Sequence, residues 1–101
     1  MQTFDFIVIG AGAMGCGAAY HLAKDRQRVL LLEQFQVGHA RGSSHGESRI
    51  FRFAYPQAEY AQLAMQTKPL WQALEEECGQ RLLLDSGGLD IADDPSGFLP
   101  R

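Results

Sequence analysis

The sequence lacks an excess of charge of either sign, and this absence excludes one large class of partners. Its 101 residues hold nine Lys and Arg against twelve Asp and Glu, which gives a net charge of −3. Domains that bind nucleic acid cluster basic residues to neutralise phosphates. We therefore expect no nucleic-acid partner. With 46% hydrophobic and 21% charged residues, the composition is typical of one small, soluble globular domain and not of a disordered chain.

Cysteine is also scarce, and long hydrophobic runs are missing. Cys16 and Cys78 form neither a CxxC pair nor a metal-ligand spacing, so we expect reduced, partly buried thiols, no metal site and a cytoplasmic protein. Residues 6–23 contain no charged side chain, but glycines interrupt them. This favours a loop over a membrane span. Asp5, and no basic residue, precedes the apolar stretch, which also disfavours a secretory signal.

The N-terminal third alternates the patterns of strand, helix and strand. Residues 4–9 are a short, β-branched apolar run that stops at a glycine, typical of a buried parallel strand. Residues 29–32 repeat this pattern just before Glu33. Between them, residues 13–24 predict a helix, because small and apolar side chains recur at spacings of three and four. That apolar face comprises Met14, Ala18, Ala19, Leu22 and Ala23. Together these elements predict an α/β fold with a right-handed, Rossmann-like βαβ unit over residues 4–33.

The remainder of the chain predicts an irregular loop, a helical segment and a strand pair. Residues 34–56 begin with a stretch rich in Gly, Ser and His that has no apolar period, and long loops of this kind are often functional. Residues 59–78 are helical in pattern, although Pro69 should kink or divide the helix and Gly79 should end it. The apolar face predicted here comprises Tyr60, Leu63, Ala64, Leu70, Trp71 and Leu74. Residues 82–92 look like a β-hairpin.

A glycine fingerprint lies between the first strand and the first helix. Gly10, Gly12 and Gly15 form GxGxxG, in which the first glycine permits a tight turn, the second lets the backbone approach a pyrophosphate and the third allows close packing of helix on strand. The helix N-terminus offers free N–H groups and partial positive charge to the phosphates. The sequence therefore predicts a dinucleotide site.

Glu33 strengthens this prediction because it ends the second strand, eighteen positions after Gly15. A carboxylate at this place can accept hydrogen bonds from both ribose hydroxyls of an adenosine and would repel the 2′-phosphate of NADP. The alternative is a glycine turn without a ligand and a solvated acid at a strand end. The fingerprint by itself does not separate NAD from FAD.

A second motif follows the βαβ unit, in residues 42–55. It concentrates Arg, His, Ser and aromatic side chains, a density that indicates an anion or a cofactor. As alternatives, Arg49 and Arg52 could be surface cations and His45 a solvated loop residue. The pattern GAGxMG, then G-S-x-H-G-x-x-R-I-x-R-x-A-Y, then a helix containing L-W, resembles the monomeric sarcosine oxidase family, which includes N-methyltryptophan oxidase and the pipecolate-type oxidases. The resemblance extends from Phe4 to about Ile91.

This resemblance implies an FAD-dependent oxidoreductase with a Rossmann-like FAD domain and a separate substrate domain. Such enzymes oxidise the C–N bond of secondary amino acids, here a small-molecule substrate, and pass the electrons to O₂ to give an imine and H₂O₂. The cofactor implied is therefore FAD and not NAD. No membrane partner is implied.

The resemblance also implies roles for individual residues. His45 and Arg49 would lie beside the isoalloxazine ring as catalytic groups, where a guanidinium can stabilise negative charge on a reduced flavin. Arg52 would hold the substrate carboxylate through its planar fork, and Tyr55 would pack near the flavin. The ADP half would contact Gly10, Gly12, Gly15 and Glu33, with Arg41, Ser43 and Ser44 further along the FAD and Ser44 on the pyrophosphate.

The chain departs from the family in extent. Members are several times longer, and the cysteine that carries covalent flavin, the lysine that activates O₂ and the substrate domain all come from later sequence. We therefore expect residues 1–101 to be the N-terminal part of an FAD-binding domain, inactive alone. Two other hypotheses stay open: a non-catalytic nucleotide-binding module or truncated remnant, and an NAD-dependent dehydrogenase.

Overall fold

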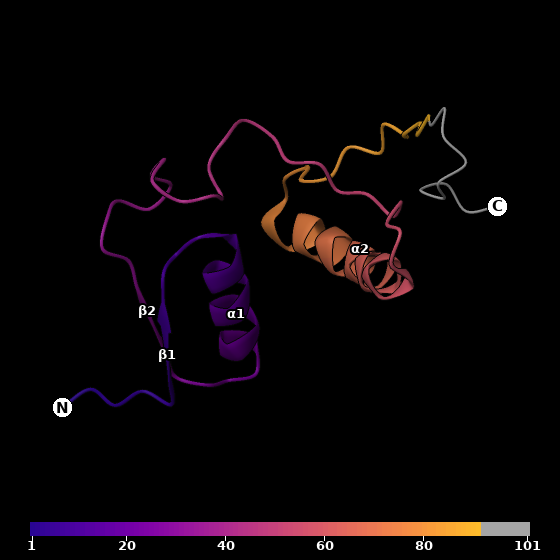
Figure 1. Ribbon diagram of the computed structural model, residues 1–101. Coiled ribbons are helices and arrows are strands. Elements are labelled where there is room, and N and C mark those ends of the chain that lie inside the picture. Colours follow the sequence, from indigo (N-terminus) through magenta and orange to yellow (C-terminus); the bar gives the residue numbers. More distant parts are fainter. Residues whose placement is uncertain (92–101) are drawn as a thin grey trace. The chain divides into compact units, whose positions relative to one another are not determined.

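A computed structural model describes residues 1–91 of the chain (Figure 1). Its elements in chain order are β1 (Phe6–Ile9), α1 (Ala13–Lys24), β2 (Val29–Leu32) and α2 (Ala58–Cys78). They fall into two compact units, Met1–Arg49 and Ile50–Arg101, and the predicted α/β class is confirmed. The predicted loop over residues 34–56 is divided between these two units.

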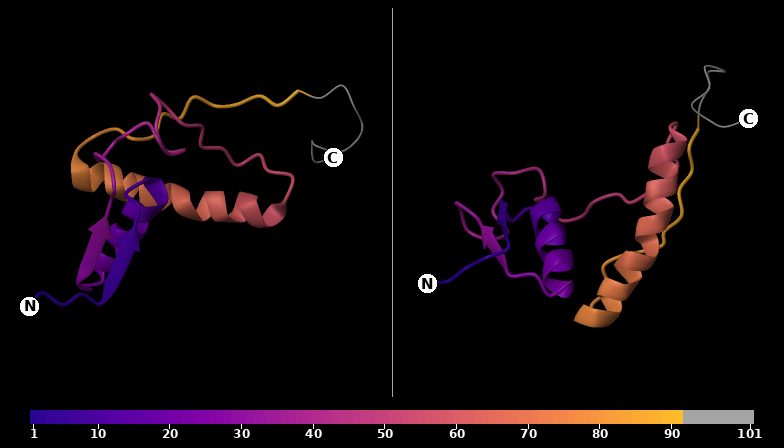
Figure 2. Two further views of the ribbon diagram at one scale, coloured as in Figure 1. Left: turned by 60° about the vertical axis from the view of Figure 1, so that its left-hand side comes forward. Right: turned by 90° about the horizontal axis from the view of Figure 1, so that it is seen from below.

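The first unit is the predicted βαβ unit. β1 and β2 are neighbouring parallel strands, with Phe6 paired to Val29 and Ile9 to Leu32. α1 crosses between them, packs on both strands (Figure 2), and has the predicted bounds. The first strand begins at Phe6 and not at residue 4.

Asp5, the residue before β1, is bound to Arg28, the residue before β2. Its carboxylate accepts hydrogen bonds from the backbone N–H of Arg28 at 2.9 Å and from the guanidinium at 3.0 and 2.7 Å, and the guanidinium also donates to Thr3 at 2.6 Å. The Arg28 side chain is the main reason that the pKa of Asp5 falls to about 2, and the backbone N–H adds to the effect. A side-chain clamp thus joins the N-terminal ends of β1 and β2.

α1 ends in a left-handed residue that is not glycine. Arg26 has φ 62°, and its N–H donates to the carbonyl of Ala23 at 2.9 Å. The N–H of Gln27 donates to Leu22 at 3.1 Å. These two bonds make a Schellman motif, in which glycine is the usual residue at the left-handed position. The motif turns the chain directly into β2.

Burial in the first unit is limited because a sheet of two strands covers little surface. Ala19 and Leu22 of the predicted α1 face are half-buried against the strands. The other predicted members of that face are exposed, and Met14 is 88% exposed. Within residues 1–91, no side chain reaches full burial.

α2 forms the body of the second unit. It runs through Pro69 without division and ends at Gly79, whose φ of 67° is left-handed, as predicted. The half-buried side of the helix differs from the predicted apolar face. Ala64 and Leu74 belong to it, but Tyr60, Leu63, Leu70 and Trp71 are exposed.

The strand pair predicted for residues 82–92 is absent up to Ile91; residue 92 lies outside the described part. The carboxylate of Glu75 accepts the backbone N–H groups of Leu82 and Leu83 at 2.6 and 2.7 Å. Lys68 pairs with Asp85 at 3.1 Å. The N–H groups that should begin a β-ladder thus bond to α2 instead, and a lone hairpin is only marginally stable.

Candidate functional site: a cavity at the glycine loop

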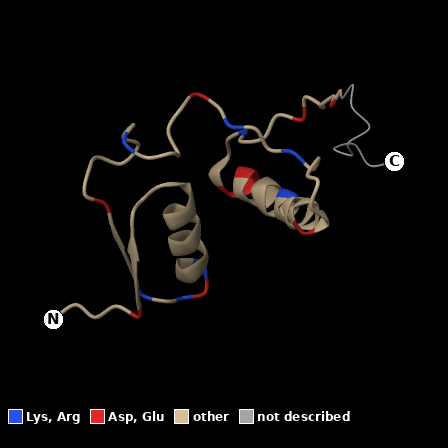
Figure 3. Ribbon diagram, in the orientation of Figure 1, with Lys and Arg blue, Asp and Glu red and all other residues tan. Residues whose placement is uncertain are grey.

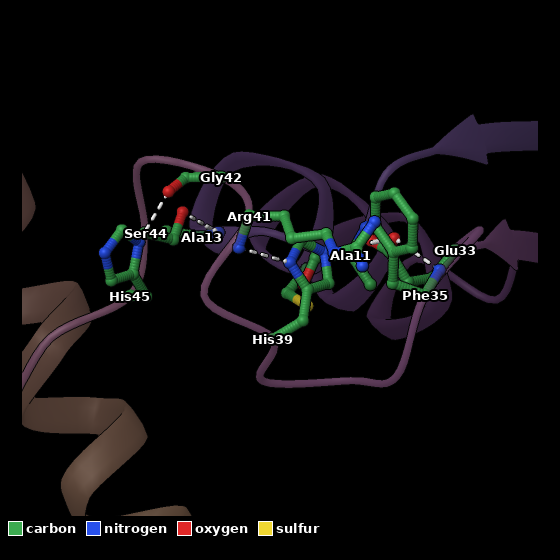
Figure 4. A network of polar contacts seen from close by, with 10 residues as sticks. Ala11, Ala13, Glu33, Phe35, His39, Arg41, Gly42, Ser44 and His45 are labelled. Atoms are coloured by element: carbon green, nitrogen blue, oxygen red, sulfur yellow. Dashed lines mark hydrogen bonds and ion pairs between the residues drawn. The ribbon is translucent and has the colours of Figure 1, made fainter.

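One cavity of about 480 Å³ lies in the first unit, where β1 and β2 end and α1 begins (Figure 4). In open α/β sheets, ligands bind outside the carboxyl ends of the strands. The lining contains eight of the residues that the sequence predicted as cofactor contacts. All the lining residues are Gly10, Ala11, Gly12, Met14, Gly15, Glu33, Gln34, Phe35, Gly38, His39, Arg41, Gly42, Ser43, Ser44 and His45.

The glycine loop has the geometry that its sequence predicts. Gly10 has φ 101°, a backbone conformation that favours glycine, and its N–H donates to the carbonyl of Leu32 at 2.7 Å. A Cβ on Gly15 would overlap the carbonyl oxygen of Gly10 and lie 3.5 Å from Val8. No side chain fits at Gly15, so α1 begins close against β1.

The N-terminus of α1 faces the cavity. Gly12 is its N-cap residue and has no side chain to offer, but the hydroxyl of Ser44 accepts the N–H of Ala13 at 2.9 Å. The first turn of α1 carries no acidic side chain, and the charged residue of this helix lies at its other end (Figure 3). The remaining N–H groups of the first turn have no partner within the helix. This end of α1 can therefore bind an anion.

Glu33 lies on the opposite side of the cavity, and its carboxylate accepts three hydrogen bonds. Oε2 accepts the N–H of Ala11 at 2.8 Å, while Oε1 accepts the N–H of Phe35 at 3.1 Å and contacts Nε2 of His39 at 3.2 Å. The Ala11 bond, followed by that of Phe35, lowers the pKa of Glu33 below its usual value, and His39 adds to the shift. The carboxylate is thus held in its charged form although the side chain is only 13% exposed.

A count of lone pairs sharpens the ribose hypothesis. A carboxylate has about four lone-pair sites, and three of those on Glu33 are in use. One site on Oε2 remains, enough for one ribose hydroxyl. A second ribose hydroxyl would have to displace one of the three groups that donate hydrogen bonds to Glu33. The sequence alone did not reveal this limit.

Four cavity residues lie outside both sequence motifs and were not singled out from the sequence: Gln34, Phe35, Gly38 and His39. The guanidinium carbon of Arg41 lies 4.5 Å from the ring centroid of Phe35, and the rings of Phe35 and His39 meet edge to face at 5.0 Å. The available signal was their place, within six positions after Glu33, the acidic residue that follows β2.

His45 and Arg49 belong to the same loop. Nδ1 of His45 contacts the carbonyl of Gly42, and the guanidinium of Arg49 donates to the carbonyls of Ser43 at 3.1 Å and Ser48 at 2.7 Å. Gly46 makes this fold possible, because it has φ 129° and a Cβ there would collide with the guanidinium. Arg49 therefore braces the loop, while His45 reaches the cavity lining.

Arg52 lies in the second unit. Its guanidinium carbon is 5.1 Å from the ring centroid of Tyr55. Nearby, the second unit has a shallow apolar groove lined by Phe51, Tyr55, Tyr60, Leu63, Ala64 and Thr67. The roles predicted for Arg52 and Tyr55 toward substrate and flavin stay predictions.

The cysteines differ from expectation, because both are free and exposed and not partly buried. Sγ of Cys16 lies 3.3 Å from the carbonyl of Ala11, at the base of the glycine loop. Among the described residues, no helix is long and apolar enough to span a membrane.

The cavity fits the adenosine diphosphate half of a dinucleotide. Its volume falls in the range of small-molecule sites. Gly12 places no side chain at the N-terminus of α1, which supplies N–H donors for a pyrophosphate, and Gly15 lets this helix begin close against β1. Glu33 supplies a charged acceptor at the far side.

Comparison with known proteins agrees with this geometry. The family described as FAD dependent oxidoreductase matches residues 5–99. Peroxisomal sarcosine oxidase of Homo sapiens is 52% identical over 86 residues, covering 85% of this chain and 22% of that protein. N-methyl-L-tryptophan oxidase of Yersinia pestis (strain Pestoides F) is 36% identical over 99 residues, covering 97% and 27%.

A solved structure is similar as well. NikD, described as an unusual amino acid oxidase essential for nikkomycin biosynthesis, superposes with a TM-score of 0.74 at 34% identity, over 80% of this chain and 21% of NikD. The chain thus spans about a fifth to a quarter of the length of these proteins. The resemblance inferred from the two motifs is confirmed, and FAD is the cofactor that the family description names. Since the match extends over nearly the whole chain, from the first strand past the second helix, the chain belongs to the FAD-dependent oxidoreductase family.

Proposed function

We propose that this chain supplies the FAD-binding end of an oxidase that acts on the C–N bond of a secondary, N-methyl amino acid. In this reaction a hydride leaves the carbon next to the nitrogen, the nitrogen loses a proton, and an imine forms. The two electrons pass through FAD to O₂, which takes up two protons to become H₂O₂. The observation that carries the proposal is the cavity in which the glycine loop, Glu33 and the 41–45 loop converge.

The ADP half of FAD would occupy this cavity. Gly10, Gly12 and Gly15 would let the pyrophosphate approach the N-terminus of α1, and Glu33 would accept a ribose hydroxyl. Arg41 and Ser43 would line the path of the cofactor. Ser44 already caps α1 as an acceptor, so its hydroxyl proton is available to a phosphate oxygen.

His45 and Arg49 would act beside the flavin ring. The bonds of Arg49 to two loop carbonyls fix its guanidinium, and a fixed cation stabilises developing negative charge without reorganising. Arg52 would bind the substrate carboxylate. The guanidinium of Arg52 lies over the Tyr55 ring, and a guanidinium that contacts a ring through its face can still donate its in-plane N–H groups to a carboxylate.

Cofactor binding is tested by titrating the purified chain with FAD and following flavin fluorescence. Glu33→Ala should weaken FAD binding about ten- to a hundredfold, because a charged acceptor is lost. Glu47→Ala, an exposed acid of the following loop, is the matched control and should bind like the unmodified chain. Tighter binding of NAD than of FAD would contradict the proposal and return the dehydrogenase hypothesis.

The substrate role is tested in an enzyme of full family length that carries this sequence. Arg52→Met should raise the KM steeply for the amino acid and much less for its decarboxylated analogue. Arg49→Met should slow flavin reduction with both substrates, since its proposed partner is the flavin. Equal losses for both substrates in Arg52→Met would leave Arg52 as a structural cation.

The proposal keeps the cytoplasm as the location and an amino acid and O₂ as the small-molecule partners. The human relative is named a peroxisomal enzyme. Microscopy of a tagged chain in its native cells distinguishes the two compartments.

A further inference from the structure

One of the three donors to Glu33 is a side chain, and neither the glycine fingerprint nor the second motif accounts for it. Nε2 of His39 lies 3.2 Å from Oε1 of Glu33, with His39 22% exposed and Glu33 13% exposed. The other two donors, the N–H groups of Ala11 and Phe35, belong to the backbone. A substitution can remove the His39 contact while leaving both backbone donors in place.

The contacts of the ring define its protonation. The backbone N–H of Arg41 donates to Nδ1 of His39 at 2.9 Å, so Nδ1 must be the unprotonated acceptor. In a neutral imidazole the proton then resides on the other nitrogen. Nε2 therefore carries a hydrogen and donates it to Oε1 of Glu33 (Figure 4).

The ring is also fixed by packing. The rings of His39 and Phe35 meet in a T-shaped arrangement, with centroids 5.0 Å apart and an interplanar angle of 78°, and the guanidinium of Arg41 lies over Phe35. A ring bonded at both nitrogens and packed on an aromatic neighbour has little freedom to turn. His39 thus links the backbone of the loop that precedes Ser43 to the carboxylate at the end of β2.

We propose that His39 is a positioning residue of the cofactor site. Fixed as the Nε2–H tautomer, it occupies Oε1 of Glu33 and thereby keeps the remaining lone-pair site of Oε2 as the acceptor for a ribose hydroxyl. The inference rests on the proposed function only in naming the ribose; the tautomer and the bond to Glu33 concern the chain alone.

Two substitutions separate this role from simple loop packing. His39→Gln places an amide donor near the position of Nε2 and keeps the bond to Glu33, but loses the acceptor at Nδ1. His39→Asn places an acceptor near Nδ1 and keeps the bond from Arg41, but does not reach Glu33. If His39 acts by positioning Glu33, His39→Gln should retain more affinity for FAD than His39→Asn. If His39 acts only in loop packing, His39→Asn should retain at least as much affinity as His39→Gln.

The first measurement is nitrogen NMR of the histidine rings in the ligand-free chain at neutral pH. We expect the pattern of a single Nε2–H tautomer for His39, and a shift of its Nε2 resonance in Glu33→Gln. A mixture of tautomers, a protonated Nδ1, or a resonance insensitive to Glu33→Gln would overturn the proposal.

The second measurement is the affinity of each variant for FAD. His39→Gln should bind within about twofold of the unmodified chain and His39→Asn about five- to twentyfold more weakly. Equal affinities for the two variants, or weaker binding by Gln, would overturn the positioning role. If the unmodified chain shows the expected tautomer and binds no FAD, the proposed function fails while the bond to Glu33 stands.

Discussion

The two units of the molecule differ in the contacts that stabilise each of them internally. In the first, hydrogen bonds join residues far apart in the sequence, such as Ala11 to Glu33 and Ala13 to Ser44, separated by 22 and 31 positions. In the second, the chain folds back on α2 through contacts such as Glu75 to Leu83, 8 positions apart. The first unit is therefore a βαβ fold closed by contacts between distant parts of the sequence. The second unit is a single helix with the following segment bound to it.

Burial does not explain this difference, because both units expose large apolar side chains, with Ile9 85% exposed in the first and Ile91 81% exposed in the second. What distinguishes the first unit is the close approach of backbones at the glycine loop. Backbone geometry of this kind follows from glycines at fixed positions. The structure of the second unit depends instead on contacts that side chains of α2 make with the following segment.

The largest expected effect breaks the backbone contact of the first unit. Gly15→Ala places a Cβ against the carbonyl oxygen of Gly10, so α1 must move away from β1. Overpacking of this kind costs about 1 to 3 kcal/mol or more, which we expect as a clear fall in the midpoint of thermal unfolding followed by circular dichroism.

Gly17→Ala is the matched control for this substitution, since it lies on the same helix with nothing within 4 Å of the added Cβ. Alanine in an open helical position should stabilise α1 by about 0.5 to 1 kcal/mol. If both variants changed the midpoint in the same direction, the contact of Gly15 with Gly10 would not set the position of α1.

The second largest effect is the pH dependence of the ion pair between Asp5 and Arg28. The pKa of Asp5 is lowered from 3.8 to about 2 by Arg28, so its ion pair stabilises the fold fully above pH 3.8 and loses this effect as the pH falls toward 2. Asp5→Asn should remove that part of the pH dependence. The measurement is urea unfolding from pH 5 to pH 2, and parallel curves for the two chains would show that the clamp does not contribute.

The sequence predicted the first unit well because its signals are local. The bounds of α1, the parallel pairing of β1 with β2 and the conformation of Gly10 follow from apolar runs and a glycine spacing that permit few alternatives. The clamp of Arg28 on Asp5 was not predicted, since nothing in either residue indicates the other. It arises only when the parallel register brings the two strand ends together.

The second unit was predicted less well for a physical reason. Periodicity identified α2 and Gly79 correctly, but it could not show which side of the helix would be covered. Lys68 and Glu75 attract the following segment by charge and by hydrogen bonds, and the apolar stripe that includes Trp71 stays exposed. In the cavity, the residues with motif signals were predicted and His39 was not, because its role depends on the place of the Arg41 backbone.

A smaller effect tests the contact that replaced the predicted hairpin. Glu75→Ala removes the acceptor of the Leu82 and Leu83 N–H groups. Their amide hydrogens should then exchange about tenfold faster, because the bonds that protect them are lost. Glu76→Ala, the exposed neighbour, should leave both exchange rates unchanged. Unchanged rates in Glu75→Ala would mean that this carboxylate does not hold the segment on α2.

The smallest effect concerns the turn that connects α1 to β2. Arg26 has φ 62°, a conformation that costs a residue with a Cβ roughly 1 to 2 kcal/mol. Arg26→Gly removes that cost but loses about 0.5 to 1 kcal/mol through the greater freedom of glycine in the unfolded chain. The free energy of unfolding of Arg26→Gly should therefore rise by about 0.5 kcal/mol, which raises the thermal midpoint by about 2 to 4 °C for a chain of this size. Arg26→Ala is the control, since it removes the charge and keeps the Cβ. An equal gain in stability in both variants would assign the effect to the charge of Arg26. A gain in Arg26→Gly alone would show that the native Arg26 is strained, and that the backbone hydrogen bonds of the turn hold it in this conformation.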